Sequence, residues 1–190
     1  RSTSPGHFDQ REKSWCIDIS TFQDFSHTLE MTRGMLAMPD GIFHWWQLPI
    51  SGIGLTRIEF IISSQICVHP MALLYPERVT DPQISDKIAA LAKGYDNYPG
   101  YFIDNLALGV GKIAASVYPK PVIVRMSDFK SNEYRGLLGG NFFEVEEENP
   151  MLGLRGASRY YHPLYREAFK LECQENLKAS QNMGFGNIVV

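Results

Sequence analysis

Residues 121–128 read PVIVRMSD, a run of β-branched residues that is entered through a proline and ends in polar side chains. Such a run predicts a buried strand. Residues 52–60, GIGLTRIEF, form a second run of this kind, with glycines at its start and polar groups toward its end. Apolar residues recur with helical spacing between the two runs. Strands that alternate with helices predict an α/β fold, built from βα units around a parallel sheet.

The rest of the chain extends this pattern toward its carboxyl end. Residues 81–115 have helical periodicity with one break, and residues 163–183 carry the register of a further helix. Residues 151–155 and 187–190 are two more strand candidates. Residues 129–149 are interpreted as a long polar loop with an acidic end.

The composition is that of a globular protein. The 190 residues are 44% hydrophobic and 21% charged, which excludes a disordered tail, a collagen-like repeat and a coiled coil. This length suffices for one ordinary domain or for part of a larger one. The net charge of -3 argues against non-specific binding to nucleic acid or to anionic membranes. The longest apolar run is far shorter than the roughly 20 residues of a membrane helix.

The three cysteines, Cys16, Cys67 and Cys173, are far apart and form no CxxC pair. This pattern favours free thiols in a reducing compartment over a disulfide framework or a zinc site. The chain starts at Arg1 without a Met or an apolar leader segment. We therefore expect a cytoplasmic protein whose given sequence begins inside a longer chain.

Arginines stand at the ends of the predicted strands. Arg57 and Arg125 each close a run, and Arg155 closes the candidate at 151–155. The carboxyl ends of parallel strands meet at one edge of a sheet, where functional groups gather. Guanidinium groups at such an edge suit a carboxylate or a phosphate. The periodicity thus predicts an anion-binding α/β domain.

Local ion pairs are the alternative interpretation of these arginines. Glu59, Asp128 and the acidic run at 146–148 lie close to them in the sequence. Asp128 and Lys130 are in turn either an acid–base pair or solvated charges in a turn. His69 and His162 each precede a proline and are interpreted as structural residues, because no nucleophile motif accompanies them.

Several long motifs resemble phosphoenolpyruvate synthases (pyruvate, water dikinases), a family of PEP-utilising enzymes. Residues 52–62, GIGLTRIEFII, resemble the family's GVGLxRxEFI strand, and residues 68–74 resemble its VHPxALL segment. Residues 118–134, YPKPVIVRMSDFKSNEY, are close to YPKxVIVRxSDFKSNEY. Residues 147–157, EENPMLGLRGA, resemble EENPMLGxRGA. The resemblance covers residues 35–190.

The resemblance implies a fold and a reaction. Residues 35–190 would form about the first four to five βα units of a PEP/pyruvate-binding (β/α)8 TIM barrel, and residues 1–34 a divergent segment. The family converts ATP, pyruvate and water to AMP, PEP and phosphate with Mg²⁺. A phosphohistidine domain and an ATP-binding domain elsewhere in the full-length enzyme would be partners of this barrel. The resemblance also implies a homo-oligomer.

The resemblance also implies roles for the basic residues. Arg57 and Arg125 match the substrate arginines of the family, which hold the carboxylate and the phosphoryl group. Arg155, Lys130 and Asp128 are further candidates for the same pocket.

The family's metal ligands and its cysteine proton donor lie on later strands and are absent here. We therefore expect this chain alone to bind no metal and to be inactive, as a (β/α)8 barrel takes about 250 residues. The competing hypothesis is a truncated, non-catalytic binding or assembly module, in which residues 1–34 and the pair Trp45-Trp46 cover the open sheet.

Overall fold

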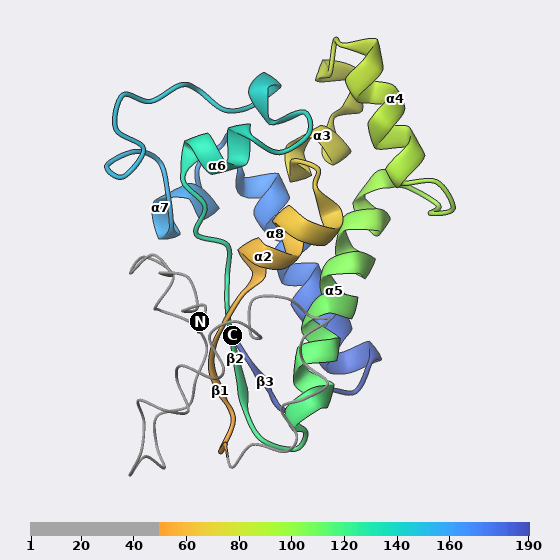
Figure 1. The fold of residues 1–190 in the computed structure, drawn as a ribbon, viewed down its shortest axis with the longest axis vertical. Helices are drawn as coiled ribbons and strands as arrows, with labels where there is room; N and C mark the ends of the chain where they lie inside the picture. Colours follow the sequence, from red (N-terminus) through yellow and green to blue (C-terminus); the bar gives the residue numbers. More distant parts are fainter. Residues whose placement is uncertain (1–49) are drawn as a thin grey trace, which may run out of the picture.

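In the computed structural model, which describes residues 50–190, three parallel strands form one sheet in the order β1-β2-β3 (Figure 1). The strands are β1 (Ile53–Arg57), β2 (Val122–Arg125) and β3 (Ile188–Val189). Each strand pairs with the next one along the chain. This arrangement confirms the predicted α/β class with a parallel sheet.

The helices follow the strands in the βα order that the sequence predicts. The α-helices are α2 (Ile58–Ile61), α3 (Pro70–Leu74), α4 (Pro82–Leu91), α5 (Tyr98–Val117), α6 (Ser131–Arg135), α7 (Ala157–Tyr160) and α8 (Arg166–Leu177). Single turns of 3-10 helix lie at Pro76–Arg78 and Gly140–Phe142, and π-helical turns lie at Ile62–Ile66 and Lys178–Asn182. Long α5 and α8 lie on one side of the strands, while α6 and α7 lie beyond their carboxyl ends (Figure 1).

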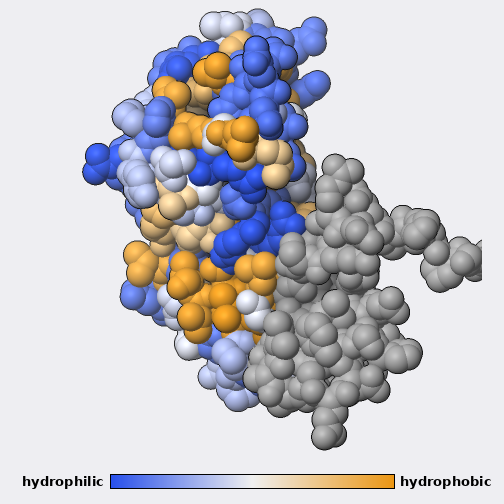
Figure 2. Space-filling model, turned by 90° about the vertical axis from the view of Figure 1, so that its left-hand side faces the viewer, coloured by the Kyte–Doolittle hydropathy of each residue, from blue (hydrophilic) through white to orange (hydrophobic). Residues whose placement is uncertain are grey.

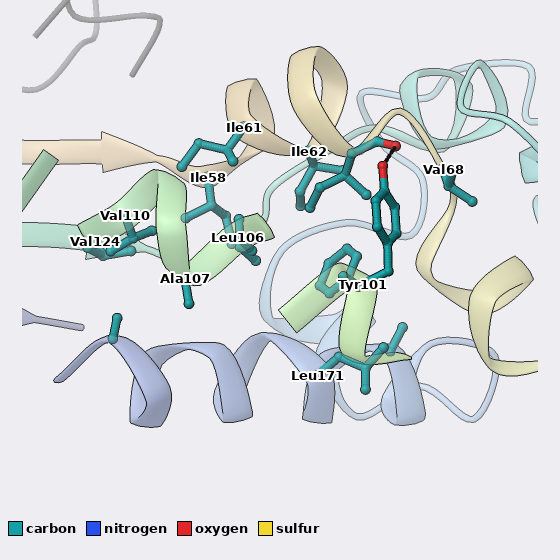
Figure 3. Packing of buried hydrophobic residues seen from close by; sticks show 14 of the residues in the cluster. Ile58, Ile61, Ile62, Val68, Tyr101, Leu106, Ala107, Val110, Val124 and Leu171 are labelled. Carbon is teal, nitrogen blue, oxygen red and sulfur yellow. Dashed lines mark hydrogen bonds between the residues drawn. The ribbon is translucent and has the colours of Figure 1, made fainter. Parts of the chain in front are cut away.

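The core lies between the sheet, α2 and α5. Figure 3 shows Leu106, Ala107 and Val110 of α5 among Ile58 of α2 and Val124 of β2. All five side chains are at most 1% exposed.

The start of α5 is set by its N-cap residue, Asn97. Its Oδ1 accepts a hydrogen bond from the backbone amide of Gly100. The helix therefore begins where its apolar stripe begins.

A hydrogen bond from a tyrosine hydroxyl joins α5 to the turn that follows α2. The Tyr101 hydroxyl donates a hydrogen bond of 3.0 Å to the carbonyl of Ile66 (Figure 3). The Tyr101 ring is 5% exposed, so this bond satisfies a polar group inside the core. The bond fixes the path of the chain after β1 and α2.

Several predicted boundaries differ from the structure. Residues 151–155 form turns rather than a strand, because Asn149 accepts hydrogen bonds from the amides of Met151 and Leu152. Leu152 is 85% exposed, so its apolar side chain is not part of a buried strand. The described residues accordingly contain three strands rather than the expected four to five.

The other differences concern helices. The run at 52–60 is a strand only as far as Arg57, and its last residues begin α2. Residues 129–149 include α6 and a 3-10 turn and are not all loop. The stretch 81–115 contains two helices, with the boundary at the break seen in the sequence. The expectations for residues 1–34 and for Trp45-Trp46 lie outside the described residues.

One face of the sheet carries exposed apolar side chains. Ile123 and Val189 are Cα partners on β2 and β3 and are 43% and 51% exposed. Figure 2 shows apolar side chains gathered on the lower half of this face, at the height of the strands in Figure 1. Among residues 50–190, no helix has the length and hydrophobicity needed to cross a membrane.

Candidate anion-binding site

Arg57 and Arg125 lie side by side at the carboxyl edge of the sheet. Each is the last residue of its strand, and the parallel register makes the two residues Cα partners. The Arg57 guanidinium lies 5.0 Å from the centre of the Phe60 ring, one turn into α2. The sequence correctly predicts that these two arginines meet at one edge of the sheet.

Glu59 joins the ends of the two strands. Because α2 starts directly after β1, this carboxylate lies in the first helical turn beside the sheet edge. It is 4% exposed and accepts a hydrogen bond from the Arg125 guanidinium. The same Oε1 atom accepts a bond of 2.9 Å from the amide of Asp128. Glu59 thus positions both Arg125 and the loop after β2.

Asp128 joins Arg125 to Arg155. Its carboxylate accepts two hydrogen bonds from Arg155, of 3.2 Å from Nε and 2.9 Å from Nη2. It also lies 3.6 Å from Nη1 of Arg125. These bonds to Asp128 raise the pKa of Arg155 above its usual value. Arg155 therefore reaches the site through a loop and not, as the sequence predicts, from the end of a strand.

The result is a row of alternating charges, Glu59, Arg125, Asp128 and Arg155. Of the local acids named as alternative partners, Glu59 and Asp128 do pair with Arg125 and Arg155, whereas Glu146 of the acidic run pairs with Arg135. Asp128 also brings the two guanidiniums together. The side chains of Arg125, Asp128 and Arg155 remain 32%, 24% and 27% exposed. Because each guanidinium has more donors than these pairs use, the row can also hold an external anion.

Lys130 pairs with Glu133 and not with Asp128. Its Nζ lies 3.6 Å from Oε1 of Glu133, and its backbone amide donates to Oε2 of the same residue at 2.7 Å. The Lys130 and Glu133 side chains are 32% and 44% exposed. The structure therefore does not pair Lys130 with Asp128 as an acid–base couple. It places Lys130 at the start of α6.

Behind the charged row lies a buried network that the sequence does not reveal. Glu172 of α8 accepts a hydrogen bond from the amide of Ser127, and its Oε1 lies within hydrogen-bond distance of the hydroxyls of Ser127 and Tyr165. Burial raises the pKa of Glu172 to about 7, although these hydrogen bonds oppose the rise. Burial also raises the pKa of Tyr134 and Tyr165 well above the usual range. No sequence pattern distinguishes Glu172 from Glu167 of the same helix, whose side chain is 42% exposed.

A second buried cluster supports the loop that carries Arg155. Arg159 is 2% exposed and donates to both oxygens of Glu144 and, at 3.0 Å, to the carbonyl of Leu154. Glu144 also accepts from Nε2 of His69 at 3.1 Å. Burial raises the pKa of Glu144, but the bonds from His69 and Arg159 outweigh it and leave the pKa below normal.

His69 is a structural residue, in line with the sequence interpretation. Its Nδ1 accepts the amide of Met71 at 3.1 Å and caps α3. The ring is therefore the tautomer that carries its proton on Nε2 and donates it to Glu144. Burial lowers the pKa of His69, against the opposing influence of Glu144.

Metal binding receives no support from this part of the chain. Residues 50–190 contain no group of three or more His, Cys, Asp or Glu side chains arranged to hold a metal ion. The carboxylates of the charged row already pair with arginines. Guanidiniums at the edge of a parallel sheet suit a small carboxylate or a phosphorylated anion instead.

Comparison with known proteins agrees with this chemistry. A family model described as "PEP-utilising enzyme, PEP-binding domain" matches residues 35–190. The phosphoenolpyruvate synthase of Synechocystis is 52% identical over 152 residues, which are 80% of this chain and 19% of that protein. The synthases of Helicobacter pylori and Escherichia coli are 44% and 45% identical over 92% and 90% of this chain, and 21% of each of those proteins.

The chain thus spans about a fifth of the length of the curated relatives that it matches. The match with the family model, by contrast, covers most of the chain, including the whole charged row at the sheet edge. The chain therefore belongs to the PEP-utilising enzymes and contains residues of their PEP-binding domain.

Proposed function

We propose that the full-length protein containing this chain is a phosphoenolpyruvate synthase, which converts ATP, pyruvate and water to AMP, PEP and phosphate. This chain would supply part of the site for pyruvate and PEP. The observation that carries the proposal is the pairing of Arg57 with Arg125 at the carboxyl edge of the sheet. The names of the matched relatives support the same reaction.

The chain would form part of a (β/α)8 barrel. The strand order β1-β2-β3 follows the sequence, and all pairs are parallel. A barrel is built in this sequential way, whereas the order of a doubly wound sheet reverses at a switch point. The exposed apolar residues on the sheet support the same proposal, since the interior of a barrel is packed with such side chains.

Arg57 and Arg125 would bind the substrate. A guanidinium holds a carboxylate through two parallel hydrogen bonds and neutralises charge on a phosphoryl group during its transfer. Arg155 would extend this basic surface, and Asp128 would hold Arg125 and Arg155 at a fixed separation. Lys130 would lie at the rim of the site, at the start of α6.

The cofactor and the partners belong to the same proposal. Mg²⁺ would be bound by residues outside 50–190, since the described side chains do not form a metal site. Phosphohistidine and ATP-binding domains would act on this site, and the full-length protein would be a homo-oligomer. Residues 1–34 would be a divergent segment preceding the domain at 35–190. The free thiols of Cys67 and Cys173 agree with a cytoplasmic location.

The competing hypothesis of a non-catalytic module has less support. The matched relatives are named as synthases and align with 80–92% of this chain at 44–52% identity. A module that had lost the chemistry would have no need of charged side chains at the sheet edge.

The test is substitution of Arg125 by Lys in the full-length protein. Lys keeps the charge beside Glu59 but loses the planar fork. We expect kcat/KM for pyruvate to fall at least about 100-fold, as for the loss of one preorganised donor. Arg135→Lys is the matched control, because Arg135 pairs with the exposed Glu146. If Arg125→Lys retained near-normal kcat/KM, the proposal would be wrong.

A further inference from the structure

Ser127, which precedes Asp128, is held at every polar atom. Its amide donates to Oε2 of Glu172 at 3.1 Å, and its hydroxyl contacts Oε1 at 2.6 Å. Its carbonyl accepts the hydroxyl of Tyr160 at 3.0 Å. Ser127 is fully buried. The position of Asp128, and with it that of the two arginines it holds, therefore depends on these contacts.

Four oxygen atoms, one of them the hydroxyl oxygen of Ser127, form a closed ring of contacts. Its hydroxyl lies 2.7 Å from the hydroxyl of Tyr134, which lies 2.5 Å from the hydroxyl of Tyr165. The Tyr165 hydroxyl lies 2.7 Å from Oε1 of Glu172. The contact between Oε1 and the Ser127 hydroxyl closes the ring. Each of these four oxygen–oxygen contacts has the length of a hydrogen bond.

The number of protons decides the charge of Glu172. The three hydroxyls bring one proton each, so an ionised Glu172 leaves one of the four contacts without a proton. Two oxygen lone pairs would then face each other at hydrogen-bond distance in a buried site. A protonated Glu172 supplies the fourth proton, and every oxygen of the ring donates once and accepts once. Oε2 remains free to accept the amide of Ser127.

We propose that Glu172 is a protonated carboxylic acid whose proton completes this ring, and that it is a positioning residue for Asp128 and the arginines of the anion site. Loss of the proton breaks one side of the ring and loosens Ser127. The consequence for substrate binding rests on the proposed function. The raised pKa of Glu172, about 7 through burial, agrees with the proton count.

Several other titratable groups face Glu172. Burial raises the pKa of Tyr134, Tyr160 and Tyr165, so these hydroxyls stay neutral in the physiological range. Glu59 contributes negative charge from α2, and Glu175 lies one turn along α8. Burial raises the pKa of Glu175 to about 8, but its carboxyl oxygens have no hydrogen-bond partner among the described residues.

Glu172→Gln in the full-length protein removes the titratable carboxyl proton but keeps the size and shape of the side chain. Its amide oxygen can accept the amide of Ser127, and its NH₂ group donates to Ser127 and Tyr165 at any pH, so the ring then holds one proton more than it has contacts and none that titrates near neutral pH. Over about pH 6 to 9, we expect the parent's KM for pyruvate to rise about tenfold and that of the variant to stay flat. Glu172→Leu should have the high KM throughout. Glu175→Gln, the matched control, should retain the rise of the parent.

Infrared difference spectroscopy of the same proteins measures the protonation of the Glu172 carboxyl group without any substrate. In Glu175→Gln, which removes the other buried carboxyl of α8, the spectrum at pH 6 should still show the C=O stretch of a buried carboxylic acid, and the double variant Glu172→Gln/Glu175→Gln should lack it. A KM rise that persists in Glu172→Gln, or a Glu175→Gln spectrum without this band, would overturn the proposal. If pyruvate were not turned over at any pH, the proposed function would fail, and the infrared band would still decide the state of Glu172.

Discussion

Arg155 donates two hydrogen bonds to Asp128, from Nε and Nη2, although 27 residues separate them and neither belongs to a strand. This fork connects the loop before α7 to the loop after β2. Because Asp128 also contacts Arg125, one carboxylate determines the separation of two guanidiniums at the sheet edge. The arrangement of the candidate anion site thus depends on an acidic residue as much as on its arginines.

Asp128→Asn should weaken substrate binding more than it slows the chemical step. Asn keeps the shape of the side chain but removes the charge that holds the two arginines, a contribution of about 1.5–3 kcal/mol per charge-assisted bond before solvent screening. We expect the KM for pyruvate to rise about tenfold with a smaller change in kcat. Steady-state kinetics of the full-length protein measures both. Glu167→Gln, which removes an exposed partner of Lys170, should leave them unchanged, and an unchanged KM in Asp128→Asn would exclude this role.

The sheet and its two arginines are predictable from sequence because they depend on local patterns. The run at 121–128 fixes β2, and parallel pairing brings Arg57 beside Arg125 without further information. The strand at 151–155 is a wrong prediction, since short apolar runs do not distinguish a strand from an exposed turn. Arg155 nevertheless lies near Arg125, because the fold brings its loop to Asp128, which contacts both arginines.

The buried network behind the site could not be predicted. Glu172 lies 45 residues from Ser127, and the charged sequence of α8 gives no sign that this acid faces inward. Glu59 lies 69 residues from Asp128. Such contacts are set by the packing of helices on the sheet, which periodicity does not specify. Composition therefore reveals the acids but not which of them are buried.

Replacing Arg159 by Met should destabilise the domain strongly. The variant leaves Glu144 buried without its main charge partner, which costs about 3–5 kcal/mol for a buried pair. Arg135→Met removes an exposed partner of Glu146 and should cost at most about 1 kcal/mol. Hydrogen exchange of the α8 amides in the full-length protein reports both free energies of opening. Similar values for the two variants would contradict the buried ion pair.

His69 should make the domain less stable as the pH falls. Its pKa is lowered in the folded state, so the unfolded chain binds its proton first, below the ordinary pKa of 6.5. The contribution of neutral His69 is therefore complete above that pH and is lost as the pH falls toward the folded-state pKa. His69→Asn keeps an acceptor for the amide of Met71 but cannot titrate, so hydrogen exchange should show a flatter pH dependence in this window. His162→Asn, at a partly exposed position, should retain the slope of the parent, and an equal slope in His69→Asn would disprove the assignment.

Two glycines of α5 should respond differently to alanine. A Cβ at Gly109 would lie 2.7 Å from Cγ2 of Ile61, whose side chain is fixed in the core, so overpacking of about 1–3 kcal/mol should exceed the gain of about 1 kcal/mol in helix propensity. A Cβ at Gly111 would meet the flexible end of Met183 at 2.8 Å and the Phe185 ring at 3.1 Å. Because Met183 is partly exposed and can move aside while the tight contact with Phe185 offsets the gain in helix propensity, Gly111→Ala should be neutral within about 0.5 kcal/mol. Urea unfolding or amide exchange of α5 measures the difference, and a Gly109→Ala variant as stable as Gly111→Ala would show that α2 can shift away from α5.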